Sequence, residues 1–218
     1  VDSTGSGKGG ELSLQSNSLI MENQGQITAE TAGNTGGNIN LKVSDIIVLR
    51  YNSTISSNAG KVDGAGDGGN ISINTSFLVA EPLENSDITA NAFAGKGGNI
   101  DITAQGVFGL RVLSRSQLES LLGTNDPQLL DPAFLPTSDI TAISQLNPNL
   151  NGQVILRSPD ADANLTSVTL PSEIVDSTQL IARGCSADGV RAKAQGSLII
   201  TGRGGLPTNP TGLISGET

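Results

Sequence analysis

The chain has no His and no Trp, and only one Tyr, four Phe and one Cys among its 218 residues. The lack of His excludes His-based catalytic triads and the commonest zinc ligand. A single cysteine, Cys185, cannot form an intramolecular disulfide, and the sequence leaves open a buried small hydrophobic residue or a reactive thiol. Because aromatic rings are scarce, the core must be filled by Ile, Leu and Val.

Basic residues are also few, and the formal net charge is −9. Nucleic-acid binding needs clusters of Lys and Arg that neutralise phosphates, so we expect no nucleic-acid partner. The sequence holds no signal peptide and no apolar run long enough to span a membrane. Since Val1 falls within repeat-like sequence, we expect a fragment of a longer exported protein whose export signal lies upstream.

A six-residue block that opens with two glycines recurs along the first half of the chain. It reads GGELSL at 9–14, GGNINL at 36–41, GGNISI at 68–73 and GGNIDI at 97–102, with a degenerate fifth copy at 151–156. Polar and apolar residues alternate in each block, which predicts a strand with one buried face. The paired glycines are expected to supply turns that tolerate positive φ.

A second, Ile-containing marker follows each block, and an apolar stretch lies between the two. The marker isoleucines are Ile27, Ile55, Ile88 and Ile140. Three short strands in a constant order predict an all-β fold, a right-handed parallel β-helix (solenoid) with three strands per coil over residues 1–158. The inward residues of the blocks should then stack in one column of a parallel sheet: Leu12, Ile39, Ile71 and Ile100.

The fourth repeat is longer than the others, which predicts an insertion at about 110–137 that projects sideways and folds independently of the stack. Ser116 and Glu119 fit a capping box and Gly123 fits a helix stop, so one short helix and a Pro-rich loop are expected. The insertion either covers the stack or serves as a binding loop. After residue 158 the repeat breaks down, and 159–218 is predicted to be a divergent C-terminal cap and tail.

No residue is predicted to be catalytic, and no cofactor or metal site is expected. The segment 63–70 resembles a calcium-binding repeat but occurs once, which favours an ordinary Gly-rich turn. Asp160 and Asp162 could form a carboxylate pair for glycoside hydrolysis, yet they lie in a turn without a nearby aromatic residue, which favours a structural role. The Gly-rich segment 202–205 lacks the Lys and Ser/Thr of a phosphate loop and is expected to be a terminal loop.

Polar residues at equivalent positions of the repeats give a further hint about function. Positions 11, 38, 70 and 99 carry Glu, Asn, Asn and Asn, which indicates an asparagine ladder or turn support rather than an acidic groove. Arg183 and Arg203 either cap the last coil or bind carboxylates at an interface. Two functions stay open: a structural adhesin shaft, which is favoured, and a β-helical carbohydrate-active enzyme.

The repeats and the C-terminal motifs resemble a known family. The Gly-Gly-Asn-Ile blocks resemble the haemagglutination-activity and repeat region of filamentous-haemagglutinin-like large exoproteins. Four motifs resemble the C-terminal region of cyanobacterial members: SDITA at 138–142, NPNLNG at 147–152, IARGCS at 181–186 and TGRGGLP at 201–207.

The resemblance covers nearly the whole chain and implies a secreted protein on the outer cell surface. It implies export by two-partner secretion through an outer-membrane transporter, a β-helical shaft, and adhesion or aggregation through an unidentified receptor. The family's N-terminal secretion domain has no counterpart here, so this segment alone is not expected to be secretion-competent.

Overall fold

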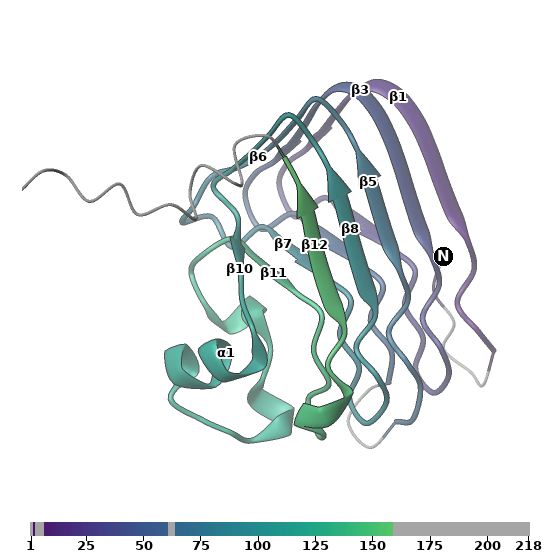
Figure 1. Ribbon diagram of the computed structural model, residues 1–218, viewed down its shortest axis with the longest axis vertical. Helices are drawn as coiled ribbons and strands as arrows, with labels where there is room; N and C mark the ends of the chain where they lie inside the picture. The colour runs from purple at the N-terminus through teal and green to yellow at the C-terminus, as the bar shows by residue number, and fades with distance from the viewer. Residues whose placement is uncertain (1, 3–6, 61–63, 159–218) are drawn as a thin grey trace, which may run out of the picture. The chain divides into compact units, whose positions relative to one another are not determined.

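The computed structural model describes Asp2 and residues 7–60 and 64–158. These residues form a mostly β structure with two sheets of parallel strands and one short α-helix (Figure 1). The chain divides into two units, Val1–Ser167 and Val168–Thr218, and all described residues belong to the first. No helix in this described part is long and apolar enough to span a membrane.

The first sheet contains the strands that the repeated blocks predict, together with the apolar stretches that follow them. Its strands are β1 (Leu12–Met21), β3 (Ile39–Leu49), β5 (Ile71–Asn74), β6 (Phe77–Ala80), β8 (Asn99–Thr103), β9 (Gly106–Phe108) and β12 (Gln153–Arg157). The order is β12-β8-β5-β3-β6-β9, with β1 also paired to β3. The first part of β3 pairs with β5 and its second part with β6.

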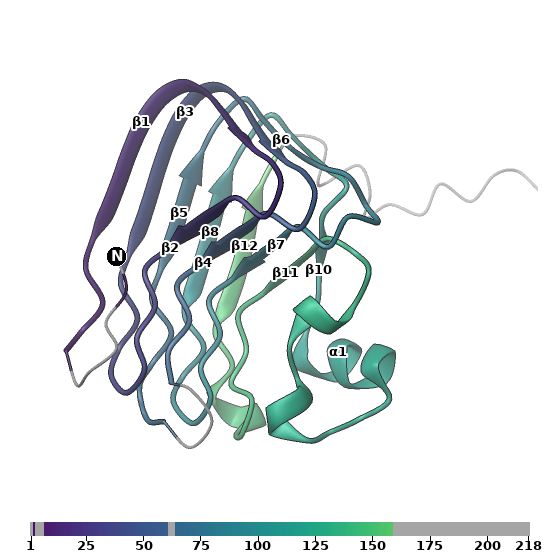
Figure 2. The same ribbon diagram turned by 180° about the vertical axis from the view of Figure 1, so that it is seen from behind.

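The second sheet contains the strands of the Ile marker. They are β2 (Gln26–Thr28), β4 (Thr54–Ser56), β7 (Asp87–Thr89) and β11 (Asp139–Thr141), with β10 (Arg111–Val112) at the edge. The order is β10-β11-β7-β4-β2, which Figure 2 shows from behind. Three separate strands per repeat occur only from the third repeat on, because the first two predicted strands are continuous in β1 and β3.

The predicted column of inward residues is confirmed. Leu12 pairs with Ile39, Ile39 with Ile71 and Ile71 with Ile100, and every pairing is parallel. The degenerate fifth block is also a strand, because Val154 of β12 pairs with Ile100.

The main core lies between the inner faces of the two sheets and is aliphatic. The positions equivalent to Leu41 in the other repeats are filled by Leu or Ile, and the second sheet adds its own Ile column to the same cluster. The residues of this column that are fully buried are Ile55, Ile88 and Ile140. The buried residues of this cluster include no aromatic side chain among the described residues, as the composition predicts.

The described glycine pairs do not adopt positive φ, and the space around them gives a different reason for glycine. Their backbones lie too close to the backbone of a neighbouring repeat to leave room for a side chain. A Cβ on Gly98 would lie 1.8 Å from the carbonyl oxygen of Gly69, and one on Gly69 would lie 1.9 Å from that of Gly37. Positive φ occurs in the turns that connect a strand of the first sheet to a strand of the second, for example at Tyr51 (52°) and Asn85 (49°).

The insertion contains the expected helix, α1 (Arg115–Leu122), and the short 3-10 helices η1 (Pro127–Leu129) and η2 (Pro132–Phe134); η3 (Pro148–Leu150) follows later. The predicted N-cap was wrong by two residues. Ser114 caps the helix and forms the capping box with Gln117, while Gly123 ends the helix at φ 66° as predicted.

The insertion is not independent of the stack, which corrects the prediction. Figure 1 shows α1 outside the two sheets, beside β10 and β11. Its apolar side chains form a second small core, and Ile143, which follows β11, belongs to that core. The insertion also supplies β10, whose Arg111 and Val112 pair with Asp139 and Ile140.

Candidate functional site

The outer face of the second sheet carries polar side chains in rows that run from strand to strand. Alternate residues point away from the core. One row holds Gln26, Thr54, Asp87 and Asp139, and a second holds Thr28, Ser56, Thr89 and Thr141. Isolated bridges continue the pairing past the strands, so Glu30, Asn58, Asn91 and Ile143 form a third row.

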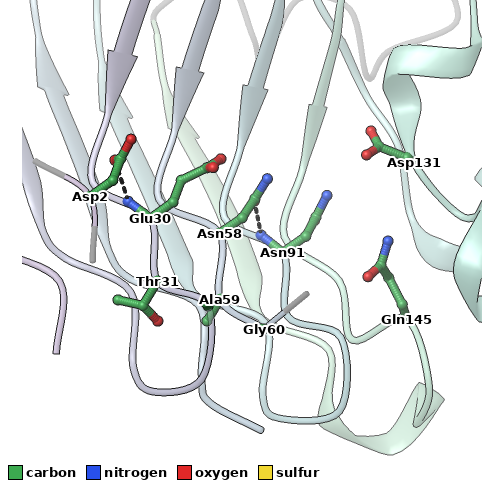
Figure 3. A pocket seen from close by; sticks show the side chains of 10 residues that line it. Asp2, Glu30, Thr31, Asn58, Ala59, Gly60, Asn91, Asp131 and Gln145 are labelled. Atoms are coloured by element: carbon green, nitrogen blue, oxygen red, sulfur yellow. Dashed lines mark hydrogen bonds between the residues drawn. The ribbon is translucent and has the colours of Figure 1, made fainter. Parts of the chain in front are cut away.

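The third row borders a groove of about 340 Å³ (Figure 3). Glu30, Asn58 and Asn91 lie along it, while Asp131 of the insertion and Gln145 lie at its far end. The row ends at the insertion because Ile143 replaces the polar residue and packs into the second core. The groove therefore combines residues of several repeats with residues of the insertion.

The amide side chains along the groove are held in place by hydrogen bonds. Asn58 Oδ1 accepts from the Asn91 N–H at 2.7 Å, and Asn91 Oδ1 accepts from the Ile143 N–H at 2.9 Å. Asn91 Nδ2 donates to Thr141 Oγ1 at 2.9 Å. Asn91 is only 4% exposed, so these bonds order the groove wall rather than leave its amide free.

Carboxylates give the groove a negative character. Asp2, Glu30 and Asp131 line it, and no Lys or Arg does so among the described residues. The Glu30 N–H donates to Asp2 Oδ1 at 3.0 Å, and this bond lowers the pKa of Asp2. Asp131 Oδ1 accepts from the Ala133 N–H at 3.0 Å. Such a groove favours ligands that offer hydroxyl or amine donors and repels anions.

Two further carboxylates, Asp87 and Asp139, form a pair beneath the insertion. The Asp139 N–H donates to Asp87 Oδ1 at 2.8 Å, and Arg111 Nε lies 3.0 Å from Asp139 Oδ1. Burial, together with the nearby charges of Asp139 and Asp131, raises the pKa of Asp87 to about 7.

A carboxyl group of raised pKa beside a second carboxyl group is typical of an acid–base pair, but this pair is inaccessible. Asp87 is 3% exposed and Asp139 is fully buried. Glycoside hydrolysis needs two carboxyl groups that flank the bond to be cleaved. The geometry therefore supports a structural role for Asp87 and Asp139.

The asparagine ladder predicted from the repeated blocks is present. Asn70 Nδ2 donates to Asn38 Oδ1, and Asn99 Nδ2 donates to Asn70 Oδ1, each at 3.2 Å. Glu11, at the equivalent position of the first block, directly precedes β1. In the Gly-rich segment, Asp67 Oδ1 accepts from the Lys96 N–H at 2.7 Å, which is a turn-supporting role.

Several residues singled out from the sequence cannot be placed. Asp63 and residues 159–218 lie outside the described residues, and with them Asp160, Asp162, Arg183, Cys185, Arg203 and the segment 202–205. Among the residues that are described, no group of three or more His, Cys, Asp or Glu could hold a metal ion.

The sequence reasoning missed the groove. Glu30, Asn58 and Asn91 lie outside the glycine blocks, and each stands three residues after a marker Ile. That spacing could have revealed the row. The positions of Asp131 and Gln145 could not be read from a repeat, because the insertion brings them to the groove.

Comparison with known proteins finds no match among protein-family models, curated proteins or solved structures.

Proposed function

We propose that the chain is a structural and adhesive segment of a secreted cell-surface exoprotein of the filamentous-haemagglutinin-like type. In this proposal the two sheets are sides of a right-handed parallel β-helix, a solenoid in which each repeat adds one coil. The repeated order of strands and their uniformly parallel pairing support it. Right-handedness follows from the strong preference of parallel crossover connections.

The observation that carries the adhesive role is the periodic polar surface. Asn38, Asn70 and Asn99 repeat one hydrogen-bonded arrangement from strand to strand. A surface that repeats at the strand spacing of about 4.8 Å can make many weak contacts with a repetitive partner. The burial of Asp87 and Asp139 also supports this role over an enzyme, because a substrate cannot reach this carboxylate pair.

The same proposal includes a route of export and two binding partners. An outer-membrane transporter of two-partner secretion would recognise a domain that lies outside this sequence, and an unidentified receptor would be bound on the outer cell surface. The net charge of −9 disfavours nucleic acid as a partner. The sequence motifs that carry the family resemblance are the basis for this part.

One observation favours the alternative, a β-helical carbohydrate-active enzyme. The groove presents Glu30 and Asp131 in a cavity of about 340 Å³, within the size range of ligand sites. Among the described residues, no aromatic side chain on which a sugar ring could stack lines the groove, which makes the enzyme the second choice.

The two functions are separated by measuring binding and turnover on the same protein. The fluorescently labelled chain is expected to bind to cells of its source and to release no reducing ends from a panel of polysaccharides. Glu30→Gln and Asp131→Asn test the groove, and Glu22→Gln, an exposed carboxylate outside it, is the matched control. Turnover that is lost in Glu30→Gln or Asp131→Asn but kept in Glu22→Gln would establish the enzyme instead.

A further inference from the structure

The groove on the second sheet carries its carboxylates at two separate ends. Glu30 lies at one end, beside Asp2, and Asp131 lies at the other, beside Gln145 (Figure 3). Glu30 follows β2 and Gln145 follows β11, and two other strands lie between these two in the sheet. Three strand spacings amount to about 14 Å. The groove is therefore elongated, with negative charge at each end.

The separation of the carboxylates disfavours a single metal ion as the ligand. A cation such as Ca²⁺ needs its oxygen ligands at about 2.5 Å, so groups from both ends cannot meet at one ion. Among the residues that the structure describes, no group of three or more His, Cys, Asp or Glu could hold a metal. An elongated cation with a charge at each end matches the groove better.

Both ends hold oxygen atoms that lack a hydrogen-bond donor. Glu30 Oε1 accepts from Ser56 Oγ, and Asp131 Oδ1 accepts from the Ala133 N–H. Gln145 Nε2 donates to a backbone oxygen of the insertion at 2.8 Å. The second oxygen of each carboxylate and Oε1 of Gln145 receive no bond from the described residues. These acceptors favour a ligand that donates hydrogen bonds at both of its ends.

The middle of the groove suits an aliphatic chain. Ala59 and Gly60 line it, and such small residues leave room for methylene groups. The wall is preorganised, because Asn58 Oδ1 accepts from the Asn91 N–H at 2.7 Å. In the outward row next to that of Asn91, Thr89 Oγ1 is buried without a hydrogen-bond partner among the described residues. This face of the sheet therefore retains unsatisfied polar atoms beside the groove as well as at its ends.

The charges around the groove favour a cation. No Lys or Arg lines it in the described part of the chain. Arg115 donates to the backbone oxygen of Gln145 at 2.9 Å, but its guanidinium is paired with Glu119. At the other end, the bond from the Glu30 N–H lowers the pKa of Asp2 and keeps that carboxylate ionised. The net charge of −9 also attracts cations from a distance.

We propose that the groove binds a linear aliphatic polyamine, with one terminal ammonium group at Glu30 and the other at Asp131. Each ammonium group carries several N–H donors for the unpaired oxygens, and such charge-assisted bonds are stronger than neutral ones. An extended triamine such as spermidine spans roughly 11 Å between its end nitrogens, a length that side chains reaching inward from about 14 Å apart can bridge. A molecule of this size fits a cavity of about 340 Å³.

The unpaired acceptors favour a polyamine over a neutral sugar. Sugar hydroxyls both donate and accept hydrogen bonds, whereas the unpaired oxygens at the two ends can only accept. The described lining residues include no aromatic side chain on which a sugar ring could stack. A polyamine is also attracted by the charge of Glu30 and Asp131, which a neutral sugar is not.

The test is isothermal titration calorimetry of the full 218-residue chain with spermidine at low salt. A single molecule is expected to bind, and Glu30→Gln and Asp131→Asn should each weaken binding at least about tenfold, because each removes a charge-assisted bond. Glu22→Gln is the matched control and should bind like the unchanged chain, since Glu22 is an exposed carboxylate outside the groove. Circular dichroism establishes that each variant is folded.

Putrescine tests the length of the site. It is a shorter diamine that cannot reach both ends, so it is expected to bind at least about tenfold more weakly than spermidine. Glu30→Gln and Asp131→Asn should reduce this difference, because each leaves one charged end for either amine.

Three results would overturn the proposal. One is the absence of spermidine binding. Another is a loss of affinity in Glu22→Gln equal to that in Glu30→Gln, which would show attraction to the overall charge alone. The third is putrescine binding as tightly as spermidine. The inference goes beyond adhesion and does not depend on it: spermidine binding by a chain that binds no cells would support the groove site and remove the proposed function.

Discussion

The two sheets are alike on their inner faces and differ on part of their outer ones. Inside, both bury columns of Ile and Leu in one core. Outside, the second sheet carries carboxylates, amides and hydroxyls beneath or beside the insertion, whereas the first sheet exposes Phe77 of β6 and Phe108 of β9. Core packing restricts only the inward residues, so the outward residues indicate what each face meets.

The largest effect is expected on the inner faces, where the two sheets should respond alike. Ile71→Asp in the first sheet and Ile88→Asp in the second each place a carboxylate in a dry aliphatic core. Each should lower the free energy of unfolding by more than about 4 kcal/mol or prevent folding. Urea unfolding followed by circular dichroism measures this.

Ser72→Asp is the matched control, because Ser72 neighbours Ile71 but is exposed. It is expected to have a small effect. Equal losses for Ser72→Asp and Ile71→Asp would show that the assignment of inner and outer faces is wrong.

A smaller effect, confined to the second sheet, is expected when the insertion is removed. Replacing residues 110–137 by a short Gly-Ser turn should keep the β-sheet circular dichroism signal. It should cost on the order of 3 kcal/mol, because Ile143 loses its apolar cover and Asp139 loses Arg111.

Adding Ile143→Thr to the deletion should recover part of that loss, since it removes the newly exposed apolar side chain. Complete unfolding of the deleted chain would show that the insertion is required for the stack to form. If the chain with the deletion alone is as stable as the unchanged chain, the insertion does not stabilise Ile143 by covering it.

The buried carboxylates of the second sheet predict a pH dependence. The pKa of Asp87 is raised from 3.8 to about 7. Below pH 3.8 Asp87 is protonated in both folded and unfolded chains, and its stabilising contribution is fully present. As the pH rises towards and through 7, the unfolded chain ionises first and that contribution is lost.

Asp87→Asn should therefore be more stable than the unchanged chain at about pH 8, by on the order of 2 kcal/mol, and the advantage should vanish near about pH 4. The amide oxygen can still accept from the Asp139 N–H. Thermal unfolding across this pH range measures the difference between the two proteins. A difference that does not change with pH contradicts the raised pKa.

The smallest effect on stability is expected at Ile20, on the outer face of the first sheet. Ile20 is 63% exposed, so Ile20→Thr should change the free energy of unfolding by less than about 0.5 kcal/mol. Urea unfolding is the measurement. A loss of several kcal/mol would mean that Ile20 belongs to the core and would remove the contrast between the outer faces.

The sequence predicts the parts of this structure that repeat. Alternation in the glycine blocks was enough to align Leu12, Ile39, Ile71 and Ile100, because parallel stacking places equivalent residues together. The same periodicity predicted the ladder of Asn70 on its neighbours, but it did not lead to the row that contains Glu30.

Other features depend on contacts between distant segments and could not be read from the pattern. Ser114 and Ser116 both begin a capping-box pattern. The packing of Leu118 into the second core decides which of them becomes the N-cap, and it is Ser114. Position 98 requires glycine because the carbonyl oxygen of Gly69 approaches it closely. Composition does not distinguish this requirement from a turn with positive φ. Asp131 reaches the groove only through the fold of the insertion.

The central claim, in-register parallel stacking of the repeats, can be tested by disulfide trapping in a Cys185→Ser background. Asn40 and Ser72 face outward on adjacent strands, whereas Ser13 lies in the same row one strand further from Ser72. Neighbouring strands lie about 4.8 Å apart, within the Cα separation that a disulfide allows, and twice that spacing exceeds it. Mild oxidation should therefore link the pair Asn40→Cys and Ser72→Cys and leave the pair Ser13→Cys and Ser72→Cys reduced. Linkage of the second pair but not the first would contradict the stacking.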